Sequence, residues 1–102
     1  MKLLLALVLS TLTSLSFAQA LLIDARNQAE YDSGHAKGAI LMPYDQVDKQ
    51  APVVLKDKNQ EIQVYCRSGN RAAKAVKSLK SLGYTNVINI GTLDDARAMQ
   101  VE

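Results

Sequence analysis

The stretch Ile62-Gln63-Val64-Tyr65-Cys66-Arg67-Ser68-Gly69-Asn70-Arg71 decides the fold of this chain, because three structural signals meet in it. The β-branched and aromatic residues 62–65 predict a buried strand, and the polar residues 67–71 predict a tight turn. Over residues 72–82, apolar side chains then recur at helical spacing. A strand, a turn and a helix N-terminus in this order surround Cys66 with free backbone N–H groups. We therefore expect an anion-binding loop with a solvent-reachable thiol at its floor.

Strand and helix patterns alternate along the rest of the chain. Apolar runs predict further strands at residues 21–23, 39–42 and 87–90, the last stopped by Gly91. Helices are expected at 27–33, capped by Asn27 and stopped by Gly34, at 44–50, ended by Pro52, at 72–82 and at 93–101. Residues 53–55 fit either a strand or a helix tail. The alternation predicts one α/β domain whose parallel sheet has about four to five strands, with helices on both faces.

The first 18 residues have the composition of an export signal. A positive start, Met1-Lys2, precedes an apolar run over residues 3–9, and small residues end the segment. This pattern predicts a signal peptide at residues 1–18, cleaved after Ala18 or Ala20, and a single domain at 21–102. A membrane anchor is the alternative, although the apolar run is far shorter than the roughly 20 residues of a span. We expect an exported, periplasmic protein without membrane contact after cleavage.

Charge and cysteine usage narrow the classes of partner. The formal net charge of +2 disfavours a general polyanion binder such as a nucleic-acid-binding protein. Between Glu61 and Asp94 no acidic residue occurs, and the basic residues there are Arg67, Arg71, Lys74, Lys77 and Lys80. One cysteine and one histidine, Cys66 and His35, form no internal disulfide and no metal site of a usual ligand count. We expect a monomer with no metal and no organic cofactor.

The residue types of the loop suit a nucleophilic thiol. The thiolate is the reactive form of cysteine, and a helix N-terminus stabilises negative charge beside it. Cys66 is therefore the candidate catalytic residue, although a buried structural thiol is the alternative. Gly69 permits backbone angles that other residues avoid. The predicted anion-binding residues are Arg67, Ser68, Gly69, Asn70 and Arg71.

The two arginines of the loop have more than one possible role. Arg67 is the candidate residue at the mouth for an anionic substrate, and a solvated surface charge is the alternative. Arg71 either closes the loop or holds the anion through its fork of donors.

Three polar residues elsewhere invite a catalytic interpretation. Asp24 and Arg26, after the first strand, are expected to form a structural ion pair, or loop bonds with Glu30, rather than to act in catalysis. His35 is expected to hydrogen-bond the backbone of its glycine-rich turn rather than to serve as a general base.

Four ordered motifs resemble the rhodanese family, specifically its single-domain, exported type. They are Leu-Ile-Asp-Ala-Arg at 22–26, Gly-His-Ala-Lys-Gly-Ala-Ile at 34–40, Val-Tyr-Cys-Arg-Ser-Gly-Asn-Arg at 64–71, and Leu-Gly-Tyr at 82–84 with Val87. The resemblance covers essentially the whole chain after the predicted signal peptide. Lys37, where a proline is common, and Gly91-Thr92, where two glycines are common, depart from the family pattern.

The resemblance implies a thiosulfate sulfurtransferase. The Cys66 thiolate would take the outer sulfur of thiosulfate as a persulfide, release sulfite, and pass the sulfur to a thiophilic acceptor such as cyanide or a thiol. A rhodanese-like sulfur carrier or protein-docking module with little turnover is the alternative. A thiol-redox function is disfavoured because the chain has no second cysteine to resolve an oxidised Cys66.

Loop length separates this chemistry from its nearest rival. Phosphatases with a Cys/Arg cradle, including members of the same fold, resemble C-x-x-x-x-x-R, whereas this chain has C-x-x-G-x-R with Arg71 one residue earlier. The shorter loop predicts a smaller pocket, which suits a single sulfur better than a tetrahedral phosphate. A phosphatase also needs an acid to protonate its leaving group, and none lies near the loop in sequence.

Overall fold

The computed structural model describes residues 20–100 of the chain. The predicted signal peptide at residues 1–18 lies outside the described residues, as does the end of the helix predicted over 93–101.

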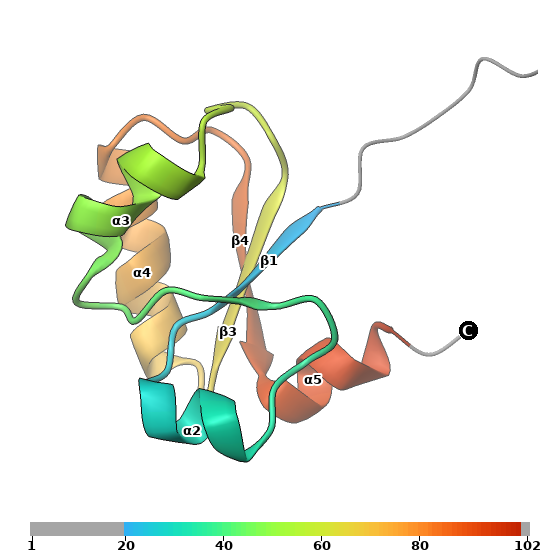
Figure 1. The fold of residues 1–102 in the computed structure, drawn as a ribbon. Coiled ribbons are helices and arrows are strands. Elements are labelled where there is room, and N and C mark those ends of the chain that lie inside the picture. Colours follow the sequence, from blue (N-terminus) through green and yellow to red (C-terminus); the bar gives the residue numbers. More distant parts are fainter. Residues whose placement is uncertain (1–19, 101–102) are drawn as a thin grey trace, which may run out of the picture.

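Four strands form one sheet in the order β2-β1-β3-β4, and Figure 1 labels three of them, β1, β3 and β4. They are β1 (Leu21–Asp24), β2 (Ile40–Leu41), β3 (Ile62–Cys66) and β4 (Val87–Thr92). All neighbouring pairs are parallel. Because the carboxyl ends of parallel strands share one edge, Asp24, Cys66 and Thr92 come together there, where sites of such sheets lie.

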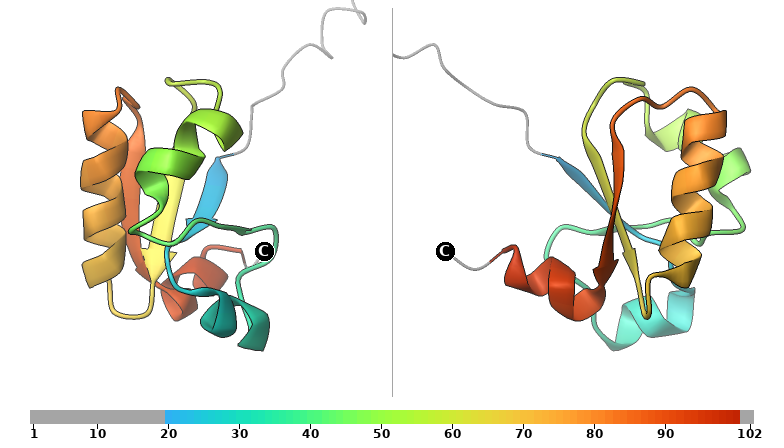
Figure 2. Two further views of the ribbon diagram at one scale, coloured as in Figure 1. Left: turned by 60° about the vertical axis from the view of Figure 1, so that its left-hand side comes forward. Right: turned by 180° about the vertical axis from the view of Figure 1, so that it is seen from behind.

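Helices lie on both faces of this sheet. Helices α3 (Val47–Val54) and α4 (Asn70–Ser81) cover one face, and α5 (Leu93–Ala98) packs on the other (Figures 1 and 2). Helix α2 (Gln28–Ser33) lies beyond the carboxyl ends of the strands (Figure 1). The predicted α/β fold with a parallel sheet and helices on both faces is confirmed.

Strand β3 divides its side chains between two cores. Ile62, Val64 and Cys66 belong to the larger core, which includes the buried alanines of α4. Tyr65 belongs to the smaller core, with Ala96 of α5. This is the two-residue period of a strand that is buried on both faces. It places the sulfur of Cys66 on the same side of the sheet as the start of α4.

The prediction that Pro52 ends a helix is wrong. Helix α3 begins at Val47, three residues later than predicted, and continues past Pro52 to Val54. Proline removes one backbone donor, but the Leu55 N–H still donates to the Ala51 carbonyl at 2.7 Å and completes the next turn. Burial of Ala51 and Leu55 favours that turn. It also assigns residues 53 and 54, which the sequence left open, to the helix.

The prediction that Gly91 stops the last strand is also wrong. Strand β4 runs on to Thr92, and Asn89 pairs with Val64 while Gly91 pairs with Tyr65, so Ile90 is an extra residue in the ladder. A bulge of this kind needs one residue with unusual backbone angles, and Gly91 has a φ of +99°. The bulge allows Thr92 to pair with Cys66, which brings the end of β4 to the loop.

Candidate active site

The sulfur of Cys66 caps the N-terminus of α4. Cys66 Sγ accepts a hydrogen bond from the Gly69 N–H at 2.9 Å and another from the Ala72 N–H at 3.2 Å. Gly69 is the N-cap residue of α4, with a φ of +94°, and it has no side chain that could accept from the first turn. The sulfur takes that place, so it lies at the positive end of a helix of 12 residues. A thiolate or a persulfide anion is stabilised in this position.

The donors to the sulfur differ in part from those predicted. Within the predicted range 67–71, Gly69 alone donates to Sγ in the described structure, and the second donor, Ala72, lies one residue beyond that range. The reason is geometric, because the third N–H of a helix points at the position of a capping acceptor. Ser68 and Asn70 are exposed, and their side chains make no hydrogen bond within residues 20–100.

The expectation of a solvent-reachable thiol is wrong for this conformation. Cys66 is 0% exposed and belongs to the larger core. Its side chain follows Ile62 and Val64 on the same face of β3. A substrate therefore reaches the sulfur only after neighbouring groups move aside.

Asn89 of β4 holds this loop from the neighbouring strand. Its Nδ2 donates to the Gly69 carbonyl at 3.1 Å, and its Oδ1 accepts from the Gly91 N–H at 2.9 Å. One side chain thus ties the cap of α4 to the bulge of β4. The sequence analysis did not single out Asn89, although an amide within an otherwise apolar strand was a usable signal.

Arg71 pairs with Glu30 of α2. Its Nη1 donates to Glu30 Oε1 at 2.7 Å and its Nη2 to Glu30 Oε2 at 2.9 Å. The hydrogen bonds from Arg71 are the main reason that the pKa of Glu30 is lowered to about 2, and they raise the pKa of Arg71. In this structure Arg71 closes the loop, which is one of its two expected roles.

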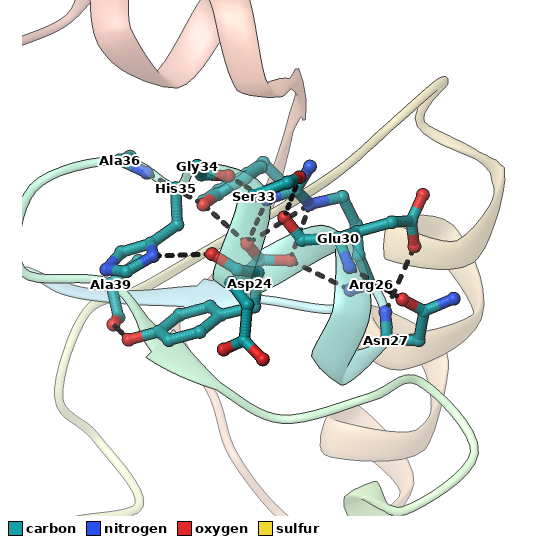
Figure 3. Close-up of polar contacts among 12 residues, drawn as sticks. Asp24, Arg26, Asn27, Glu30, Ser33, Gly34, His35, Ala36 and Ala39 are labelled. Carbon is teal, nitrogen blue, oxygen red and sulfur yellow. Dashed lines mark hydrogen bonds and ion pairs between the residues drawn. The ribbon is translucent and has the colours of Figure 1, made fainter.

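A buried ion pair supports the same edge of the sheet. Arg26 Nε donates to Asp24 Oδ1 at 2.9 Å and Nη2 to Oδ2 at 2.8 Å, and Nη2 also donates to the Gly34 carbonyl (Figure 3). The Asp24 side chain is 0% exposed and that of Arg26 is 7% exposed. The expected structural pair is therefore present, whereas Glu30 pairs with Arg71 instead of with Arg26.

Tyr65 extends this network to the turn before β2. Its hydroxyl donates to Asp24 Oδ2 at 2.7 Å and accepts from the Ala36 N–H at 3.0 Å. Burial is the main reason that the pKa of Tyr65 is raised to about 12, and the Asp24 carboxylate raises it further. The network fixes the ends of β1 and β3 relative to each other, and with them the start of the loop.

His35 is part of the framework around α2. Its Nδ1–H donates to the Tyr31 carbonyl at 2.8 Å, and its ring stacks on that of Tyr31 with 3.7 Å between centroids. It bonds a backbone group, as expected, but the partner belongs to α2 and not to the glycine-rich turn. No contact in the described structure joins His35 to Cys66.

A hollow lies beside the loop at the carboxyl edge of the sheet. Its volume is about 350 Å³, and it is lined by Arg26, Glu30, Ser33, Arg67, Thr92, Leu93 and Asp94. Arg67 is exposed at this hollow. Cys66 does not itself line the hollow, but Arg67 follows it in sequence and Thr92 pairs with it across the sheet.

Within residues 20–100, no group of three or more His, Cys, Asp or Glu side chains is arranged to hold a metal ion. None of the helices described there combines the length and the apolar character that crossing a membrane requires.

The comparisons with known proteins agree on one protein family. The rhodanese-like domain family matches residues 9–91, a range that begins inside the predicted signal peptide. The thiosulfate sulfurtransferase PspE of Escherichia coli (strain K12) is 36% identical over 86 residues, which are 84% of this chain and 83% of that protein. The putative sulfur carrier protein YrkF of Bacillus subtilis (strain 168) is 33% identical over 69 residues, 68% of this chain but 36% of that protein.

Solved structures give the same result at the level of the backbone. A rhodanese with anions from E. coli matches with a TM-score of 0.72 and 35% sequence identity, over 76% of this chain and 91% of that one.

Proposed function

We propose that this chain, which belongs to the family of rhodanese-like domains, is a thiosulfate sulfurtransferase that works through a persulfide on Cys66. The observation that carries the proposal is the pair of N–H groups, from Gly69 and Ala72, that point at Sγ from the start of α4. They stabilise the negative Sγ of the thiolate, both before it takes a sulfur atom and after it has passed that atom on. The chain has no other cysteine that could take this role.

The first step is a displacement at the outer sulfur of thiosulfate. The Cys66 thiolate attacks that sulfur, a new S–S bond forms, and the bond to the sulfite group breaks. Sulfite leaves with the bonding electron pair, so the total charge is conserved and Cys66 becomes a persulfide anion. Arg67 assists by attracting the dianionic donor to the exposed mouth of the loop.

The second step returns the thiolate. A thiophilic acceptor, cyanide or a thiolate, attacks the outer sulfur of the persulfide, and the S–S bond to Cys66 breaks with its electrons left on Sγ. The Gly69 and Ala72 N–H groups again receive the charge on Sγ. Both steps need the bend at residues 67–69 to open, because Cys66 is fully buried when it is closed.

We also propose that the protein acts in the periplasm. The positive start, apolar run and small residues of 1–18 support this location. A test is N-terminal sequencing of the protein recovered from an exporting bacterial host, with cleavage after Ala18 or Ala20 expected. An uncleaved chain in the cytoplasm would overturn the proposal.

A sulfur carrier with little turnover is the second candidate. The complete burial of Cys66 favours it, since a protein partner could open the loop when it docks. In that case the persulfide would form and persist in the presence of small acceptors. Both the sulfurtransferase and the sulfur carrier would form the persulfide. The two candidates differ in whether a small acceptor then removes its sulfur.

Mass spectrometry of the intact protein tests both candidates. After thiosulfate, the wild type should gain one sulfur, about 32 Da, and cyanide should remove it with release of thiocyanate. Cys66→Ser should gain nothing while keeping its circular dichroism spectrum. No gain in the wild type, or an equal gain in Cys66→Ser, would refute the proposed chemistry, and a gain that resists excess cyanide would favour the carrier.

A further inference from the structure

We propose that the hollow beside the loop selects the sulfur acceptor, and that this acceptor is a small thiol with both an ammonium and a carboxylate group, of the cysteine type. The inference rests on the proposed function and names the acceptor class at the same site. The charged side chains that line the hollow, and the ion pairs that some of them form, support this acceptor.

The hollow has the position and the size that an acceptor site requires. Arg67 follows the nucleophile directly, and Thr92 pairs with Cys66 across the sheet, so both place the hollow next to the loop. Its volume of about 350 Å³ lies at the lower end of the range of about 300–1,000 Å³ for small-molecule sites.

Two of the four charged side chains in the lining already have partners. Arg26 is bound to buried Asp24, and Glu30 is bound to Arg71. The other two, Arg67 and Asp94, are exposed and take part in no ion pair within residues 20–100. The hollow therefore offers one guanidinium and one carboxylate to a ligand.

The structure of α5 leaves Asp94 available. The helix is capped by Thr92 and Asp95, since the Asp95 carboxylate accepts from the Thr92 N–H at 2.9 Å and the Asp95 N–H donates to the Thr92 hydroxyl. This cap satisfies the first turn without Asp94. Within the described residues, the Asp94 side chain makes no hydrogen bond, and it faces the hollow.

This charge pattern suits a zwitterion better than a dianion. A thiosulfate dianion gains from Arg67 but is repelled by Asp94, and the four charges of the lining cancel. An acceptor with a carboxylate for Arg67 and an ammonium for Asp94 meets an opposite charge at both. Its thiolate attacks the outer sulfur of the Cys66 persulfide, and the bond between that sulfur and Sγ breaks. The products are the acceptor persulfide anion and the Cys66 thiolate, with no change in total charge or in the number of electrons.

The test follows transfer from preloaded protein to matched thiols. The Cys66 persulfide is formed with thiosulfate, or with inorganic polysulfide if thiosulfate fails to load it, and excess donor is removed. Transfer rates, per thiolate, are then measured for cysteine, for N-acetylcysteine, which lacks the ammonium, for cysteine methyl ester, which lacks the carboxylate, and for 2-mercaptoethanol. Cysteine should be fastest, by roughly two- to fivefold per charged contact.

Variants assign the effect to the hollow. Asp94→Asn should lower the rate for cysteine to about that of N-acetylcysteine and the rate for cysteine methyl ester to about that of 2-mercaptoethanol, and leave N-acetylcysteine unchanged or faster. Asp48→Asn is the matched control, because Asp48 is an exposed acid in the first turn of α3, outside the hollow. Equal rates for all four thiols, or equal effects of the two variants, would overturn the acceptor assignment. Failure of thiosulfate to load Cys66 would instead overturn the proposed donor, and polysulfide loading keeps the acceptor test valid.

Discussion

Arg71 and Glu30 tie the loop that follows Cys66 to helix α2 through two parallel hydrogen bonds of 2.7 and 2.9 Å. The two residues are 41 positions apart in sequence, and their side chains are 28% and 22% exposed. A pair with two hydrogen bonds in a partly buried place has a fixed geometry that an exposed pair lacks. This bond therefore limits how the loop opens.

Acid should weaken the fold through Glu30. Its pKa is lowered from 4.5 to about 2, mainly by the Arg71 hydrogen bonds, so in acid the unfolded chain binds a proton that the folded chain does not. The contribution of Glu30 to the free energy of unfolding is complete above about pH 4.5 and is lost as the pH falls through about 2. Urea denaturation between these pH values should show a shallower loss of unfolding free energy in Glu30→Gln than in the wild type. Equal slopes in the two proteins would contradict the assignment.

Arg71→Lys should keep the charge but lose the two-pronged bond. Lysine presents a single compact donor group, so we expect a loss of about 1 kcal/mol in unfolding free energy and slower persulfide formation. Arg71→Ala leaves Glu30 without its partner and should lose more, about 1–3 kcal/mol. Chemical denaturation and single-turnover loading with thiosulfate measure the two effects. A lysine variant as stable and as fast as the wild type would show that the fork geometry is unimportant.

Release of the Asn89 contact should expose the thiol. Asn89→Ala removes the bond to the Gly69 carbonyl, so the bend at 67–69 should open more often and iodoacetamide should alkylate Cys66 several times faster. Asn86→Ala is the matched control, because Asn86 is also exposed but precedes β4 at the opposite end of the strand. Faster alkylation in both variants would point to general destabilisation, and no change in either would show that Asn89 does not hold the loop.

The Gly69→Ala variant distinguishes an effect of backbone strain on stability from an effect on persulfide formation. Gly69 has a φ of +94° and Gly38 one of +79°, and an added β-carbon would meet no atom within 4 Å at either position. Both alanine variants should therefore lose about 1 kcal/mol of unfolding free energy from backbone strain alone. Only Gly69→Ala should also slow persulfide formation, because strain at this position displaces the backbone N–H that donates to Sγ. Equal loading rates in the two variants would show that the exact position of that N–H does not limit persulfide formation.

Much of the architecture follows from local patterns. The strand before Cys66, the amphipathic helix after it and the Asn27 cap of α2 are encoded in residues close together in sequence, and all three are present. The two errors, at Pro52 and Gly91, arise where tertiary contacts override a local stop signal. Burial of Ala51 and Leu55 continues α3, and pairing with β3 continues β4.

The candidate site was harder to predict in detail. Cys66 and the loop are contiguous in sequence, so the pattern predicted their place between β3 and the start of α4. The contacts of Arg71 with Glu30 and of Asn89 with Gly69 span 41 and 20 positions, and no local signal specifies such pairs. For the burial of Cys66 two local signals conflict, because the alternation along β3 points its side chain into the core whereas the turn residues that follow suggest exposure.

The helix-capping role of the sulfur links the covalent state of Cys66 to the melting of the protein. A reagent that blocks Sγ with a bulky neutral group removes the charged acceptor of two N–H groups, whereas a persulfide keeps a negative charge on its outer sulfur, one bond beyond Sγ. The melting temperature should therefore differ between the chemical forms of Cys66, so a melting curve reports sulfur loading without any label.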